Sequence, residues 1–169
     1  MPDYNTLYKE GRIASWYLRQ EDQIDLYNRL HVSNKLVSVV HRRWGKTTTK
    51  FTYIFEKCLI EETPVRYGAP TLKMANEIFS TITDHIFIHA THLKPRHSAQ
   101  EGGYVFPNGS IIRLFGGKDG SEIDKAGRGG EAKIIYVDEF GFFKFKPDYL
   151  ISQFCHHSSI PSEQMGSYL

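Results

Sequence analysis

Cysteine is scarce in this sequence, and long apolar runs are absent. The two cysteines, Cys58 and Cys155, lie far apart and form no CxxC or Cys/His pattern, which favours reduced thiols in a cytosolic compartment over a disulfide framework. No run approaches the roughly 20 apolar residues of a membrane span, and the N-terminus has no apolar signal-peptide core. We therefore expect an intracellular protein that is neither secreted nor inserted in a membrane.

The sequence also lacks internal repeats, low-complexity tracts and a strong excess of one charge. The net charge of +2 permits contact with nucleic acid but does not by itself argue for it. Hydrophobic residues make up 40% of the chain and charged residues 24%, an ordinary globular composition. The length of 169 residues predicts a single domain over residues 1–169.

Helix-period segments and short apolar runs alternate along the chain. The pattern predicts helices over about 21–30, 49–62 and 72–83, buried strands over 36–40, 65–70 and 133–137, and a hairpin that joins 104–106 to 111–115 through Pro-Asn-Gly. Such an alternation indicates an α/β fold in which helices flank a mostly parallel central sheet.

A phosphate-binding loop is predicted where the first apolar run meets the next helix. The segment HRRWGKT follows residues 36–40 and ends as a Walker A loop does, although Val40 stands in place of the usual first glycine. Gly45 allows the backbone to approach phosphate oxygens, Lys46 can reach the β- and γ-phosphates, and the Thr47 hydroxyl can ligate Mg²⁺. The position between a strand and a helix is the context that this motif requires.

Two acidic residues follow the last apolar run, as in a Walker B motif. Asp138 would lie at the carboxyl end of the strand over 133–137 and bind Mg²⁺, while Glu139 would act as the general base on the attacking water. In open α/β sheets, ligands bind at the carboxyl ends of the strands. The two motifs together therefore predict one site for Mg-ATP.

Five segments, taken in order, resemble the ATPase domain of the large terminase subunit, the DNA-packaging motor of tailed bacteriophages. They are LRQEDQIDLYNRL, HRRWGKTT, YGAPTLK, FPNGSII and Gly127-Arg128-Gly129 before the Walker B strand. The resemblance covers about residues 15–140, and it accounts for a Walker A loop that carries arginines and lacks its first glycine.

The resemblance implies particular roles for residues around the nucleotide. Gln23 would read the adenine edge, with Gln20 as the second choice. Arg128, flanked by glycines, could serve as an arginine finger for a neighbouring subunit, while Arg42 or Arg43 could act in cis. The expected catalytic residues are Glu139, Lys46, Arg128 and Arg42; the nucleotide-binding residues are Gln23, Arg42, Arg43, Trp44, Gly45, Lys46, Thr47 and Thr48; and the Mg²⁺ ligands are Thr47 and Asp138.

The resemblance further implies an additional-strand (ASCE), RecA-like P-loop fold that couples ATP hydrolysis to translocation of double-stranded DNA into a procapsid. Its partners would be the portal protein, the small terminase subunit and other copies in a ring, in the cytoplasm of an infected bacterium. The coupling motif and the nuclease domain of the family have no counterpart here, so we expect a domain truncated near its C-terminal end, slow hydrolysis and no DNA cleavage. The alternatives are a helicase-like DNA-dependent ATPase and a non-catalytic nucleotide-binding assembly module.

Overall fold

The computed structural model describes residues 21–33, 36–118, 120, 121, 123, 132–144 and 149. The elements, in chain order, are α2 (Glu21–Val32), α3 (Lys46–Ile60), β1 (Val65–Ala69), α4 (Leu72–Ile86), η2 (Thr91–Leu93), β2 (Arg96–Ser98), β3 (Gly103–Val105), β4 (Ile111–Gly116), β5 (Ile134–Val137) and η3 (Phe140–Phe142). Among these residues no helix is both long enough and apolar enough to cross a membrane.

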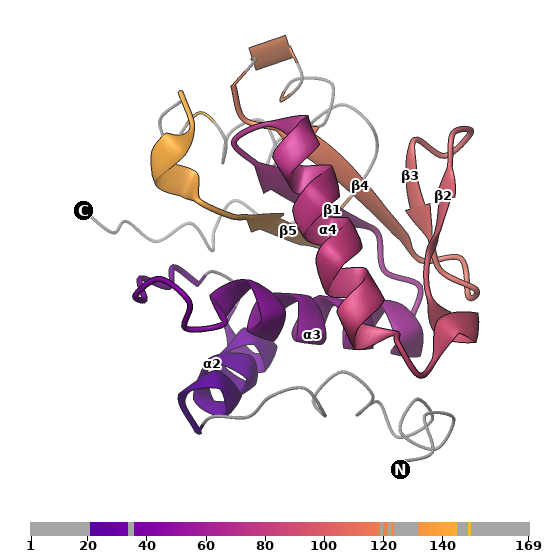
Figure 1. Ribbon diagram of the computed structural model, residues 1–169, viewed down its shortest axis with the longest axis horizontal. Helices are drawn as coiled ribbons and strands as arrows, with labels where there is room; N and C mark the ends of the chain where they lie inside the picture. The colour runs from indigo at the N-terminus through magenta and orange to yellow at the C-terminus, as the bar shows by residue number, and fades with distance from the viewer. Residues whose placement is uncertain are drawn as a thin grey trace, which may run out of the picture.

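The described strands form one sheet in the order β2-β3-β4-β1-β5 (Figure 1). Strands β4, β1 and β5 run parallel, whereas β2 and β3 extend the sheet beyond β4 in antiparallel pairing. The α/β class is confirmed, but the expectation of a mostly parallel sheet is wrong because the sheet is mixed. The sequence did not predict β2, since the residues Arg-His-Ser of this short edge strand carry no apolar signal.

The main core lies between the sheet and the helices α3 and α4, whose ribbons can be followed in Figure 1. Strand residues of alternating orientation, such as Tyr67 of β1 and Tyr136 of β5, point into this core. They meet Phe51 of α3, whose ring centroid lies 4.7 Å from that of Tyr67 and 5.6 Å from that of Tyr136. Phe79 of α4 packs on the same ring at 5.8 Å. This packing holds the start of α3 against β5.

Residues 36–40 form no strand, so this prediction is wrong. The side chains of Val37 and Val39 are 90% and 92% exposed. A strand is buried only when other strands pair with it, and β5 pairs with β1 but with no other described strand. Residues 36–40 are apolar and β-branched and so have β propensity, but no neighbouring strand pairs with them and buries them.

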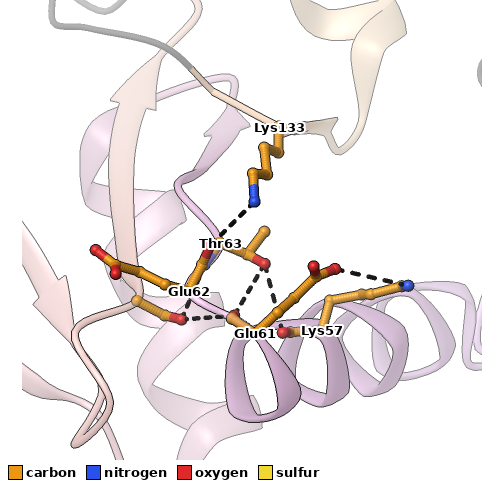
Figure 2. Close-up of polar contacts among 6 residues, drawn as sticks. Lys57, Glu61, Glu62, Thr63 and Lys133 are labelled. Atoms are coloured by element: carbon orange, nitrogen blue, oxygen red, sulfur yellow. Dashed lines mark hydrogen bonds and ion pairs between the residues drawn. The ribbon is translucent and has the colours of Figure 1, made fainter.

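The C-terminal end of α3 is tied to the starts of the parallel strands. The Thr63 hydroxyl lies 3.0 Å from the Glu61 carbonyl and 3.4 Å from the Lys57 carbonyl, and the Lys133 ammonium donates to the Glu62 carbonyl at 3.2 Å (Figure 2). The Ser110 hydroxyl accepts from the Thr63 amide at 3.0 Å. The Lys57 carbonyl in the last turn of α3 thus gains a second donor besides the Glu61 amide, and the Glu61 and Glu62 carbonyls just beyond the helix have donors as well.

The Pro-Asn-Gly turn completes this attachment. Asn108 donates from Nδ2 to the Cys58 carbonyl at 2.6 Å, and the Ser110 hydroxyl lies 2.6 Å from the same oxygen. Gly109 has a φ of 92°, a conformation that favours glycine. The hairpin turn predicted from sequence thus caps α3 at the end opposite the predicted phosphate loop.

Candidate nucleotide-binding site

The loop before α3 has the backbone of an anion-binding turn. Arg43 has a φ of 67° and Gly45, the N-cap of α3, has a φ of 94°. Positive φ alternating with ordinary values brings successive N–H groups toward one side, and the first-turn N–H groups of the helix lack intrahelical partners. Only Arg43 and Glu139 among the described non-glycine residues have positive φ, and they lie in the two predicted motifs.

The α2 helix supports this loop from outside. Gln23 of α2 donates from Nε2 to the Trp44 carbonyl at 2.8 Å. A Cβ atom on Gly45 would lie only 2.3 Å from the same Nε2 atom. The positive φ therefore favours glycine at position 45, whereas the Gln23 amide, as the end of a flexible side chain, could move aside for a Cβ atom.

The two predicted motifs meet at Asp138. The Lys46 ammonium lies 3.0 Å from Asp138 Oδ1, and the Thr47 hydroxyl donates to Oδ2 at 2.8 Å although 91 positions separate the two residues. The side chain of Asp138 is 3% exposed and that of Lys46 is 28% exposed. A buried carboxylate thus has its charge balanced by the lysine at the start of α3.

The sheet places Asp138 and Glu139 at the end of β5. The Asp138 amide donates to the Gly68 carbonyl at 2.8 Å, so the β5–β1 pairing continues to this residue. The chain then turns at Glu139, whose φ is 51° and whose amide donates to Asp138 Oδ1 at 3.0 Å. The Asp138 carboxylate is held in the site, while Glu139 is exposed beside it.

Electrostatics in the site favour an ionised Asp138. Burial alone would raise the pKa of this carboxyl, but hydrogen bonds from Lys46 and Thr47 and the charge of Lys46 outweigh burial and lower the pKa. Lys50, one turn further along α3, lies above the Tyr136 ring with its ammonium 4.8 Å from the centroid. Burial, followed by the charge of Lys46, lowers the pKa of Lys50, while Asp138 partly offsets that shift.

The other predicted residues have varied positions. Arg42 and Arg43 are exposed, and within the described chain neither guanidinium forms an ion pair. Thr48 lies in the first turn of α3 and its carbonyl accepts from the Thr52 hydroxyl at 2.9 Å. Gln20 and Arg128 lie outside the described residues.

Sequence reasoning missed two residues that the fold brings to the site. Lys50 is four positions after Lys46 on α3, and Tyr136 is two positions before Asp138 on β5. Helical and strand periodicities place each of them on the same face as its motif neighbour. These spacings were therefore the signal that could have identified both residues.

The described residues contain no group of three or more His, Cys, Asp or Glu side chains that could hold a metal ion. The chain matches no protein-family model, and no curated protein or solved structure is significantly similar to it.

Proposed function

We propose that this chain is a P-loop ATPase domain that binds Mg-ATP between the start of α3 and the end of β5. One observation carries the proposal: Lys46 and Thr47, at the N-terminus of a helix, contact the buried carboxylate of Asp138 at a strand's carboxyl end. A lysine, a hydroxyl and a strand-end carboxylate are the side chains that P-loop enzymes direct at a nucleotide and its metal.

The donor set fits a nucleotide-bound Mg²⁺. Mg²⁺ is commonly held by one or two carboxylates together with substrate phosphates, so a group of three protein carboxylates is not required. The Thr47 hydroxyl and the Asp138 carboxylate, 2.8 Å apart, would provide the protein ligands. When bound, Mg²⁺ supplies positive charge that offsets the charge developing on the phosphates.

Other residues of the site would bind the phosphates or take part in hydrolysis. Lys46 would exchange its contact with Asp138 for the β- and γ-phosphates, and the amides at the start of α3 would add hydrogen bonds. Glu139, exposed beside the site, would accept the proton of the attacking water. We propose the ASCE, RecA-like form of the P-loop fold for this arrangement because an acidic pair follows the β5 strand.

Nucleotide binding tests this proposal directly. We expect the wild type to bind Mg-ATP in a calorimetric titration and Lys46→Ala to lose tight binding, because the main counter-charge to the phosphates is removed. Lys57→Ala is the matched control, since Lys57 lies on the same helix about 16 Å along its axis. If the wild type bound no ATP, or if Lys46→Ala bound it equally well, the proposal would be wrong.

The resemblance to large terminase subunits supports a more specific proposal about the work that hydrolysis drives. We propose that this ATPase serves viral genome packaging, in which a ring of copies at the portal protein, together with a small terminase subunit, moves double-stranded DNA. Stimulation of phosphate release by double-stranded DNA more than by single-stranded DNA would support it. Stimulation by single strands alone would favour the helicase-like alternative, and no phosphate release under any condition would favour the non-catalytic module.

A further inference from the structure

Tyr136 lies beside the proposed nucleotide site, and the proposed function gives it no role. It is two residues before Asp138 in β5, so both side chains point to the sheet face that α3 covers. Tyr136 is 6% exposed, and its ring supports the Lys50 ammonium. The phenol therefore lies under the first turns of α3, in the layer that holds Asp138.

The Tyr136 hydroxyl is buried and has no partner at hydrogen-bond geometry within the described chain. The Thr47 hydroxyl and the Asp138 carboxylate nevertheless lie within reach of a side-chain hydrogen bond from it. A tyrosine side chain at neutral pH is an ordinary protonated phenol, which can donate a hydrogen bond. A buried polar group without a hydrogen-bond partner is uncommon in native proteins and calls for an explanation, and for Tyr136 the neighbouring Asp138 carboxylate offers one.

Nucleotide binding would create a place for that donor. Asp138 Oδ1 now accepts from Lys46 and from the Glu139 amide, and Oδ2 accepts from Thr47. If Lys46 turns toward phosphate, as the proposed function requires, Asp138 loses its strongest donor. The carboxylate would then keep one hydrogen bond on each oxygen, from the Glu139 amide and the Thr47 hydroxyl, and could accept a further donor in place of Lys46.

We propose that Tyr136 is a positioning residue, whose hydroxyl donates to Asp138 in the nucleotide-bound state and keeps the carboxylate directed at Mg²⁺. This inference rests on the proposed function and adds to it a second support for the metal ligand. Lys50 completes the arrangement, because its ammonium remains near Asp138 as counter-charge after Lys46 has moved to the phosphates. Tyr136 contacts neither phosphate nor metal and acts only through Asp138.

The structure offers a matched control in Tyr67. It stands opposite Tyr136 in the register of β1 and β5, with the rings stacked at a centroid distance of 5.3 Å. Its hydroxyl is likewise buried and without a hydrogen-bond partner among the described residues. Tyr67→Phe and Tyr136→Phe therefore remove the same group from the same layer, but only Tyr136 precedes the metal ligand on its own strand.

The test is a calorimetric titration with ATP, in Mg²⁺ and separately in EDTA, with thermal unfolding measured for each variant. We expect Tyr136→Phe to weaken Mg-ATP binding about tenfold or more, the effect of one hydrogen bond to a charged group, and to leave metal-free ATP binding unchanged. Tyr67→Phe should change neither affinity. If Tyr136 positions Asp138, its loss should lower the affinity for Mg-ATP but not for metal-free ATP. If Tyr136 only stabilises the fold, its loss should lower both affinities.

Two results would overturn the inference while leaving the proposed function standing. One is a Tyr136→Phe protein that binds Mg-ATP as tightly as the wild type. The other is an equal loss of Mg-ATP and metal-free ATP binding together with a lower melting temperature. If the wild type itself bound no ATP, the proposed function would be wrong, and this inference would be wrong with it.

Discussion

The side-chain amide of Gln23 donates to the backbone carbonyl of Trp44 at 2.8 Å and thereby joins α2 to the loop before α3. The resemblance suggested that Gln23 reads the adenine edge. The contact indicates another use of the same amide, which is to hold the loop in the conformation in which Arg43 and Gly45 have positive φ.

This contact leads to a prediction about nucleotide selectivity. We expect Gln23→Ala to weaken ATP and GTP binding by similar factors. Without the Gln23 contact the loop before α3 is less ordered, and either nucleotide would have to order it on binding. Calorimetric titration with both nucleotides measures this. Arg29→Ala is the control, since among the described residues its side chain forms only an exposed ion pair with Asp25 on the same helix. A loss confined to ATP would instead support adenine recognition by Gln23.

Glu139→Gln should separate binding from hydrolysis. The carboxamide keeps the shape of the side chain but cannot accept the proton of water, and general-base catalysis contributes roughly 10²–10⁴-fold. We expect Mg-ATP affinity close to that of the wild type and phosphate release lower by about that factor. The control is Glu77→Gln, which alters an exposed i,i+4 pair on α4. Full turnover by Glu139→Gln would remove Glu139 from the role of base.

The lowered pKa of Asp138 predicts how stability depends on pH. A carboxyl whose folded pKa lies below its unfolded value stabilises the fold above the unfolded value, here 3.8, and loses that contribution as pH falls through the folded pKa. Denaturant unfolding of the wild type and Asp138→Asn should therefore differ by a constant amount above about pH 5. The difference should shrink below pH 3.8. A difference that stayed constant down to the acid limit of folding would contradict the assigned direction of the shift.

Ser110→Ala should destabilise the protein through the end of α3. The substitution leaves the Thr63 amide without its acceptor in a fully buried position, a loss of about 1–3 kcal/mol in unfolding free energy. Ser98→Ala is the matched control, because within the part of the chain that the structure describes the Ser98 hydroxyl accepts only an exposed amide, that of Glu101, at 3.3 Å. Chemical denaturation of both variants gives the comparison. Equal stabilities would show that the Ser110 contacts contribute little.

Much of the secondary structure followed from local pattern alone. The helices α2, α3 and α4 lie where the helical period predicted them, and β1, β5 and the β3–β4 hairpin lie where apolar runs and Pro-Asn-Gly predicted them. These predictions succeeded because side-chain spacing and turn chemistry act over a few residues. The pairing of Lys46 with Asp138 could likewise be expected, since strand ends and helix starts meet at one edge of an α/β sheet.

The sequence by itself thus determined the elements, the two motifs and their approximate meeting point. Only the tertiary structure decided that the sheet is mixed, that residues 36–40 remain outside it, and that Lys50 and Tyr136 lie beside Asp138. Each of these depends on which segments become neighbours. Burial of a strand and the pKa of a lysine or phenol are set by what surrounds them, and distant parts of the chain supply those surroundings only after folding.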